Sequence, residues 1–145
     1  MRTVLIAAMT LLVAAAAADK AAIVVQAPDS PIRIDHTAVF TAPEAPPVLL
    51  YQATNLTDQP LEQFTVMVFV FGADGTLKAR QVAPGRRTLD ARGAKYSAMV
   101  LDGSEILPTD IIVAGVNQAQ RVGSESWWRA DVQAAAEAAV PRKKP

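Results

Sequence analysis

Cysteine is absent from this chain, and histidine occurs once, at position 36. The absence of cysteine excludes disulfide bonds and the thiolate ligands that most structural zinc sites use. A zinc site would have to be built mostly from carboxylates, which is unusual. We therefore predict that the protein binds no transition metal and carries no cofactor.

Neither sign of charge is in excess, because 14 lysine and arginine residues balance 14 aspartate and glutamate residues. A near-neutral chain has no general attraction for the phosphates of nucleic acid. The sequence also lacks a P-loop and a Gly-x-Gly-x-x-Gly motif, and its seven glycines stand singly, as turns require. We predict no nucleic-acid partner.

The residues that acid–base or nucleophilic chemistry requires do not form a recognisable site. His36 directly follows Asp35 in a predicted strand, and neighbouring strand residues point to opposite faces, so this pair does not make an Asp–His dyad. Carboxylate pairs occur only at predicted turns, where aspartate forms local hydrogen bonds. These pairs are Asp102 with Glu105 and Asp74 with Asp90. We predict that the protein is not an enzyme.

The first residues have the three parts of a secretory signal peptide. Arg2 precedes an uncharged apolar run from Val4 to Val13, and alanines follow up to Ala18. The apolar run is shorter than the ~20 residues that a membrane-spanning helix needs. We predict cleavage after Ala18, a periplasmic or secreted protein, and no membrane span after processing. Cleavage leaves 127 residues with 13 basic and 14 acidic side chains.

Ten prolines and several turn residues divide the remaining chain into short apolar segments, a pattern typical of an all-β sandwich or barrel. We predict an immunoglobulin-like antiparallel β-sandwich of seven or eight strands over residues 19–125. A short C-terminal helix and a disordered basic tail follow over residues 126–145. The predicted strands are 23–26, 32–40, 48–55, 61–71, 76–82, 86–89, 95–101 and 110–117.

The segment from Leu61 to Phe71 is apolar on both of its alternating faces. Such a strand is either covered on both sides, or its outer face meets a partner or the C-terminal helix. The alanine-rich sequence after Ser126 predicts that helix, with Ser124 or Ser126 as its cap. An aromatic and apolar set forms either core beneath the helix or, if the helix leaves it uncovered, a protein interface. The set is Met67, Phe69, Phe71, Trp127 and Trp128.

Residues 51–100 contain motifs that resemble the FxLYD-like group of exported bacterial β-sandwich domains. The motifs are Asn55-Leu56-Thr57, the alternating 61–71 strand, Asp74-Gly75, and the segment from Leu89 to Gly93 before Tyr96. Two positions depart from the group's pattern, Gly72 and Ala91. The resemblance implies a non-enzymatic module whose partners vary from protein to protein. Asn55-Leu56-Thr57 also fits a glycosylation acceptor, but we interpret it as a turn.

A basic run is opposed within its own segment only by Asp90. In the predicted topology Lys78 and Arg80 share one face of a strand, and Arg86-Arg87 lie in the following loop. Such a patch would hold an anionic ligand or polymer through bidentate arginine contacts, whereas dispersed charge on a solvated face is the alternative. The run comprises Lys78, Arg80, Arg86, Arg87, Arg92 and Lys95.

These patterns favour an exported, non-catalytic β-sandwich that binds or scaffolds another cell-envelope or extracellular protein, through an edge strand or the aromatic face. A binding module for an anionic ligand or polymer, carried by the Arg86-Arg87 region, is the alternative function.

Overall fold

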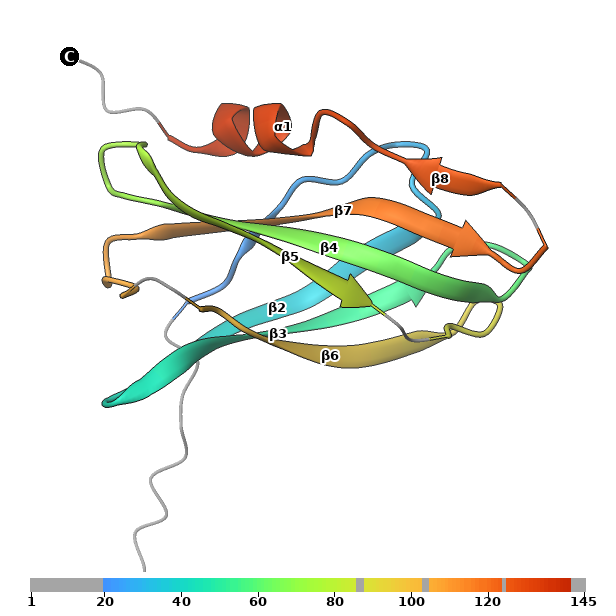
Figure 1. Cartoon of the computed structure of the whole chain (residues 1–145), viewed down its shortest axis with the longest axis horizontal. Helices are drawn as coiled ribbons and strands as arrows, with labels where there is room; N and C mark the ends of the chain where they lie inside the picture. Colours follow the sequence, from blue (N-terminus) through green and yellow to red (C-terminus); the bar gives the residue numbers. More distant parts are fainter. Residues whose placement is uncertain (1–19, 86–87, 103–104, 124, 142–145) are drawn as a thin grey trace, which may run out of the picture.

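Two β-sheets pack face to face in this computed structural model, which describes residues 20–85, 88–102, 105–123 and 125–141 (Figure 1). The three-stranded sheet has the order β2-β3-β6, and the five-stranded sheet has the order β1-β7-β4-β5, with β8 also paired to β7. The three-stranded sheet contains β2 (Ile32–Ala42), β3 (Ala45–Asn55) and β6 (Ala94–Val100). The five-stranded sheet contains β1 (Ile23–Val24), β4 (Leu61–Phe71), β5 (Leu77–Gly85), β7 (Ile111–Arg121) and β8 (Ser126–Trp128).

The strand connections make the sandwich immunoglobulin-like. Hairpins join β2 to β3, β4 to β5 and β7 to β8, whereas the chain changes sheet between β1 and β2, β3 and β4, β5 and β6, and β6 and β7. These changes place β6 beside β3 and β7 beside β4, which is the Greek-key arrangement of such sandwiches. Neighbouring strands are antiparallel except that β1 runs parallel to β7. The predicted fold class is confirmed.

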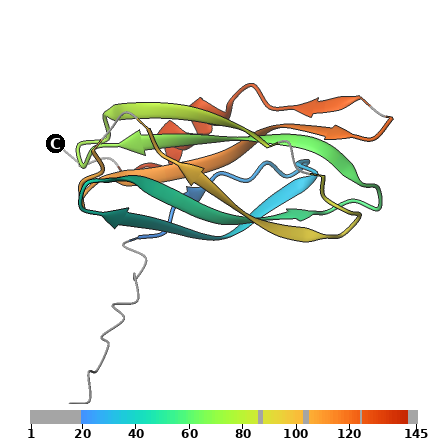
Figure 2. The same ribbon diagram turned by 60° about the horizontal axis from the view of Figure 1, so that its bottom comes forward.

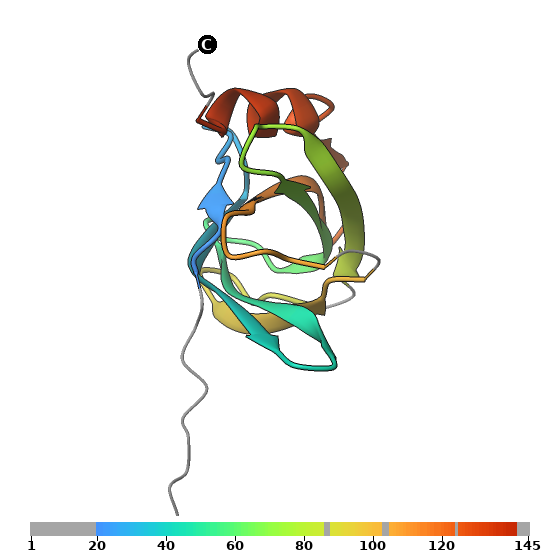
Figure 3. The same ribbon diagram turned by 90° about the vertical axis from the view of Figure 1, so that its left-hand side faces the viewer.

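The inner faces of the two sheets form the main core because apolar residues alternate with outward-facing ones along each strand. Leu49, Tyr51 and Ala53 on β3 face Phe64, Val66, Val68 and Val70 on β4, and all are at most 4% exposed. Figure 3, which views the sandwich from one end, shows the two layers with the helix above the five-stranded sheet. Because each sheet lends one face to this core, each also has an outer face that must meet solvent, a helix or a partner.

The helix α1 (Val132–Ala139) covers the outer face of β4 and β7. Beneath it lies a second apolar cluster, in which Phe69 and Phe71 are at most 1% exposed. Gly115 permits this close approach, because a Cβ there would lie 2.8 Å from Val25 Cγ2 and 2.9 Å from Val132 Cγ1. The two apolar faces predicted for the 61–71 strand are therefore both buried, one in each cluster.

The C-terminal segment corrects one sequence expectation. Residues 126–128 form strand β8, and the helix begins only after Asp131, which occupies the N-cap position without a side-chain capping bond. Trp127 and Trp128 pair with Ala119 and Gln118 of β7, so the edge of the sheet, and not the alanine-rich sequence, decides their conformation.

Two further segments differ from expectation. A register shift lies between Asp35 and Ala38, and His36 within it has a φ of 49° and an exposed side chain, so it does not continue the buried face of Ile32 and Ile34. The gap between the predicted strands 32–40 and 48–55 is mostly strand, since β2 continues to Ala42 and β3 begins at Ala45, so only Pro43 and Glu44 form the hairpin tip.

The turn at Asn55-Leu56-Thr57 is built by the buried Asn55 side chain. Its Oδ1 accepts hydrogen bonds from the Thr57 amide at 2.9 Å and the Thr57 hydroxyl at 2.8 Å. Its Nδ2 donates to the carbonyl oxygens of Gln59 at 2.8 Å and Asp90 at 3.1 Å. The amide is therefore committed to tying two loops together, which confirms the interpretation as a turn.

The predicted signal peptide, residues 1–18, lies outside the described residues, as do Arg86, Arg87, Ser124 and the end of the tail at 142–145. Among the residues that the structure describes, no helix is both long and apolar enough to cross a bilayer.

Candidate functional site

The outer face of the three-stranded sheet is apolar toward the β2–β3 hairpin and polar at its other end, where Arg33, Asp35, Gln52 and Thr54 lie. No helix or strand of the described chain lies over it, whereas α1 lies over the opposite sheet (Figures 2 and 3). Its outward-facing residues alternate with buried ones such as Val39, Leu49 and Met99. We call this surface the open face and define it by Ala38, Phe40, Val48, Leu50, Tyr96, Ala98 and Val100.

Strand register brings the residues of the open face together in rows. Phe40 pairs with Val48, and Val48 pairs with Val100, so these three side chains lie side by side across the sheet. A second row contains Ala38, Leu50 and Ala98. Directly opposed side chains in neighbouring strands contact one another, so the rows form one continuous apolar surface.

Two side chains of the open face are strongly exposed. Tyr96 is 53% exposed and Val100 is 45% exposed, and both lie on β6, an edge strand of the sheet. Phe40, Val48 and Leu50 are half-buried by their neighbours. A contiguous exposed apolar patch of this kind marks an interaction surface more often than isolated apolar residues do.

The backbone at both edges of this sheet is partly covered. At β2, the Val39 amide donates to the Lys20 carbonyl at 2.7 Å, and the Ala22 amide donates to the Thr37 hydroxyl at 2.9 Å. At β6, the Gln81 side chain donates to the Val100 carbonyl at 2.6 Å. These contacts oppose strand addition at those positions, so the face is the more accessible surface.

The aromatic and apolar set expected from the sequence does not form one interface. Phe69 and Phe71 are buried beneath α1, and Met67 packs partly against the same cluster, so the expectation of an exposed interface is wrong for the two phenylalanines. The helix removes this face from solvent. Trp127 packs partly against the main core, whereas Trp128 is 69% exposed at the edge of the five-stranded sheet.

The described members of the basic run lie in two places. Lys78 and Arg80 lie near the start of β5, where Lys78 Nζ is 2.6 Å from Asp110 Oδ2 and Arg80 Nη1 donates to Gln133 Oε1 at 3.1 Å. Arg92 lies in the turn before β6, and Lys95 is the second residue of β6.

Each of the latter two has its own local partner. Arg92 Nη2 is 2.8 Å from Asp58 Oδ1, and Lys95 Nζ donates to the Thr88 carbonyl at 2.7 Å. Arg86 and Arg87, which carry the anion-binding hypothesis, are outside the described residues. The structure therefore brings Lys78 near Arg80 and Arg92 near Lys95, but it does not gather the four into one patch.

Asp110 is a buried carboxylate that holds one end of the sandwich together. Its side chain is 2% exposed, and it accepts hydrogen bonds from Lys78 Nζ and from the Leu107 amide. Lys20 Nζ donates to the backbone carbonyls of Leu107, Pro108 and Asp110 at 2.7–3.0 Å. Burial raises the pKa of Asp110, but the Lys78 hydrogen bond, the Leu107 amide and the charges of Lys78 and Lys20 outweigh it, so the pKa lies below its ordinary value.

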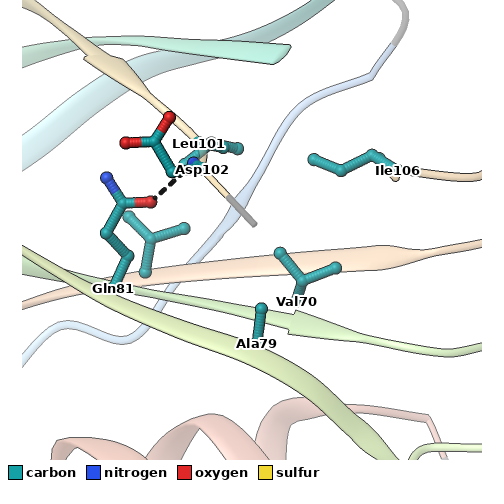
Figure 4. A pocket seen from close by; sticks show the side chains of 7 residues that line it. Val70, Ala79, Gln81, Leu101, Asp102 and Ile106 are labelled. Carbon is teal, nitrogen blue, oxygen red and sulfur yellow. Dashed lines mark hydrogen bonds between the residues drawn. The ribbon is translucent and has the colours of Figure 1, made fainter. Parts of the chain in front are cut away.

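The space between the two sheets, beside β5 and the end of β6, is too small for a ligand. A cavity of about 10 Å³ lies between Val68, Val70, Leu101 and Ile106, which is room for about one water molecule. Gln81 crosses its mouth and accepts a hydrogen bond from the Asp102 amide at 3.0 Å (Figure 4). The sandwich interior is therefore a packed core.

A wider hollow of about 570 Å³ lies between the β2–β3 hairpin tip and the chain around Glu105. Glu44, Asp102 and Glu105 line it, together with three prolines of the hairpin. Within the part of the chain that the structure describes, no three acidic or histidine side chains come close enough to hold a metal ion. In the Asp35-His36 pair, the Asp35 carboxylate accepts hydrogen bonds from Arg33 and Thr54.

Sequence reasoning missed the open face. The signal was present in Val48-Leu49-Leu50-Tyr51, which is apolar on both alternating faces just as 61–71 is. A second signal was that the sequence predicts a single short helix, which can cover only one of the two outer faces of a sandwich. The exposed Tyr96 carries no signal of its own, since its position on the outer side depends on the register of β6.

Comparison with known proteins assigns the chain to no family. No family model and no curated protein matches it. A solved structure described as "X-ray structure of Northeast Structural Genomics Consortium target SoR45" aligns over 67% of this chain and 79% of its own, with 18% identity and a TM-score of 0.47. The class that the structure defines is an all-β sandwich of immunoglobulin-like topology, with one outer face covered by a helix and the other open.

Proposed function

We propose that this protein is an exported, non-catalytic β-sandwich that binds another cell-envelope protein through the open face. The observation that carries the proposal is the continuous apolar surface of Phe40, Val48, Leu50 and Val100, with Tyr96 at its border. Apolar and aromatic residues that leave water on association supply most of the binding free energy of protein interfaces. The resemblance to the FxLYD-like group remains a prediction that agrees with such a module.

The binding surface is the face of the sheet, because Lys20 and Gln81 already occupy part of its edge backbone. A partner with an apolar strand or helix face would cover this sheet much as α1 covers the other one. The covered face is an example within the same molecule, since the eight-residue helix together with Val25 and Val140 buries Phe69 and Phe71.

The test compares two exposed valines that differ in the sheet to which they belong. Val100 is 45% exposed on the open face, and Val82 is 48% exposed on β5 of the five-stranded sheet. A tagged chain of residues 19–145 carries a photoreactive amino acid at one of these positions and is crosslinked in the native envelope. We expect a discrete crosslinked protein from position 100 and none from position 82.

The same partner should be captured by the wild-type chain and by the Val82→Asp variant, but not by the Val100→Asp variant. Circular dichroism establishes that both variants fold. Equal capture by all three chains contradicts the proposal. A homodimer in sedimentation analysis that Val100→Asp abolishes also overturns it, because the open face would then bind a second copy of this chain.

A further inference from the structure

A groove lies at the edge of the five-stranded sheet, away from the open face. It runs between the chain that precedes β2 and the segment from β8 to the start of α1, and its volume is about 390 Å³. This volume falls within the range of about 300–1,000 Å³ found for small-molecule sites. The residues that line it are Ala27, Pro28, Asp29, Trp127, Trp128, Arg129, Ala130 and Asp131.

One wall of the groove is an indole ring that the fold leaves in water. Trp128 is 69% exposed, although so large an apolar ring is costly to leave in contact with water. Its neighbour Trp127 is fixed, because its Nε1 donates to Asp29 Oδ2 at 3.1 Å and its ring packs partly against the main core. In Figure 1 the segment before β2 passes behind β8, in agreement with this hydrogen bond. The Trp128 ring is therefore available to a ligand, and the face of an indole attracts cations.

The basic side chain of the groove is committed within the protein. Arg129 Nε donates to Asp131 Oδ1 at 2.8 Å, and Arg129 Nη1 donates to the Val25 carbonyl at 2.8 Å. The Arg129 side chain is only 14% exposed. Little of this guanidinium is therefore left to meet a ligand.

The acidic side chains of the groove outnumber this guanidinium. The Asp131 side chain is 68% exposed, and the hydrogen bond from Arg129 keeps the pKa of Asp131 below its ordinary value, so Asp131 is charged at neutral pH. Asp29 adds a second carboxylate, and its hydrogen bond from the neutral Trp127 indole balances none of its charge. Two carboxylates against one arginine leave the groove with net negative charge.

A buried acceptor beside Trp128 adds to this negative potential. Gln118 lies directly opposite Trp128 in the register of β7 and β8, so the two side chains share one face of the sheet. Gln118 is 5% exposed, and among the described residues its Oε1 has no hydrogen-bond donor. A carbonyl dipole without a donor places partial negative charge beside the indole.

These groups favour a cation with N–H donors over other ligands. An anion would be repelled by the two carboxylates. A metal ion needs more ligands than the groove offers, because no three acidic or histidine side chains of the described chain gather closely enough to hold one. A neutral sugar would balance none of the negative charge.

A guanidinium group suits these surroundings better than an ammonium group does. It is planar and weakly hydrated, so it stacks on an aromatic ring and donates two parallel hydrogen bonds to a carboxylate. An ammonium group is compact and strongly hydrated, so more of its contact with water must be given up on binding.

We propose that the groove between residues 27–29 and 127–131 binds the guanidinium group of an arginine, stacked on Trp128 and facing the carboxylates of Asp29 and Asp131. Two sources offer this group, an arginine side chain in a partner protein and free L-arginine, and the experiment separates them. This inference does not rest on the proposed function, because the groove shares no residue with the open face.

The test follows the backbone amide signals of the isotope-labelled chain of residues 19–145 by NMR. The titrants are a blocked Gly-Ser-Arg-Ser-Gly peptide, the same peptide with lysine or citrulline in place of arginine, and free L-arginine. We expect the arginine peptide to shift the signals of residues 127–131 with a Kd of about 1 mM, the affinity of one stacked and paired guanidinium. The lysine peptide should bind about 3-fold more weakly. The citrulline peptide keeps the shape but loses the charge, so it should not saturate the site up to about 20 mM.

The relative affinity of the peptide and the free amino acid identifies the source. Tighter binding of the arginine peptide assigns the site to an arginine of a partner protein. Tighter binding of free L-arginine assigns it to the small molecule, whose own carboxylate must then be tolerated by Asp29 and Asp131.

Two variants locate the binding. Trp128→Ala should weaken it at least about 5-fold, because the stacking surface is lost. A double variant with Asp29→Asn and Asp131→Asn should weaken it more than about 10-fold, because each asparagine keeps an acceptor oxygen for its neighbour but loses the charge. The dispersion of the amide signals shows that each variant is folded.

Each variant has a matched control outside the groove. Tyr96→Ala removes an exposed aromatic ring from the open face. Asp74→Asn removes an exposed carboxylate from the β4–β5 turn, at the other end of the five-stranded sheet (Figure 1). Both controls should bind the arginine peptide as the wild type does.

Several outcomes overturn the proposal. They are no saturable shift with either arginine ligand, binding of the lysine or citrulline peptide as tight as that of the arginine peptide, unchanged affinity in Trp128→Ala or in the double variant, and saturable binding of cellotriose without binding of arginine. Loss of arginine binding in Val100→Asp would place the site on the open face and also overturn the inference, whereas intact binding in a Val100→Asp chain that no longer captures its envelope protein supports two separate sites.

Discussion

The two outer faces of this sandwich have similar strand chemistry but different surroundings. On β4, Phe69 and Phe71 lie beneath α1 and are at most 1% exposed. On β2 and β3, Phe40 and Val48 lie in register on the opposite outer face with no covering element in the described chain. Alternation of apolar and polar residues therefore shows which side of a strand faces the core only where the other side meets water. An apolar outer face requires a third layer to cover it, supplied by the same chain or by another.

The largest expected difference between the faces is in packing. Phe69→Ala should lower the free energy of unfolding by about 3–5 kcal/mol, because it leaves a cavity beneath the helix. Phe40→Ala should lower the free energy of unfolding by about 1 kcal/mol, because part of the half-buried Phe40 ring is in contact with water in the folded protein. Urea denaturation measures both values. Equal losses would mean that the open face is as well packed as the covered face.

Addition of a methyl group should also distinguish the faces. Gly115→Ala places a Cβ within 2.9 Å of Val25 and Val132 side-chain atoms and should cost about 1–3 kcal/mol, since the helix must shift away from β7. Ala98→Val on the open face adds methyl groups that reach solvent and should change stability by less than about 0.5 kcal/mol. Thermal unfolding of the two variants beside the wild type checks this. An unchanged Gly115→Ala variant would show that α1 packs loosely.

The ion pair between Lys78 and Asp110 should contribute about 1 kcal/mol to the free energy of unfolding, and this contribution should depend on pH. Charge-assisted hydrogen bonds of this kind are about twice as strong as neutral ones. The folded pKa of Asp110 is lowered from its ordinary 3.8, so this stability is complete above that value and is lost as pH falls through the folded pKa. Asp110→Asn should therefore be less stable than the wild type at pH 7 and approach it at low pH. A difference that does not change with pH would assign the effect to packing.

The smallest expected effect concerns charge on the surface. Val100→Asp and Val82→Asp should lower the free energy of unfolding by amounts that differ by less than about 0.5 kcal/mol, because each replaces a half-exposed strand valine by a residue that disfavours strands. Chemical denaturation of the pair is the measurement. A large loss of stability for Val100→Asp alone would mean that the open face is buried in solution. The oligomeric state would then have to be measured before the crosslinking comparison.

Much of the fold could be predicted from local patterns. The bounds of the 61–71 strand, the turn at Asn55-Leu56-Thr57 and the turn after Phe71 follow from alternation and from turn residues whose preferences act over a few positions. The strand at Ser126–Trp128 could not be predicted, because pairing with β7 overrides the helix propensity of the following alanines. The candidate surfaces could be predicted only in part, since Trp128 was expected to contribute but Phe40, Leu50 and Tyr96 were not.

The sequence by itself determined most of the extended segments up to residue 121, several of the turns between them, and that their apolar residues must be buried on at least one side. Only the tertiary structure decided which apolar face the helix covers, that Phe69 and Phe71 are core, and that the four described residues of the basic run lie in two places. The reason is that local preferences act over a few neighbours, whereas the choice between two similar outer faces depends on contacts such as Gly115 with Val132, which only the assembled sheets create.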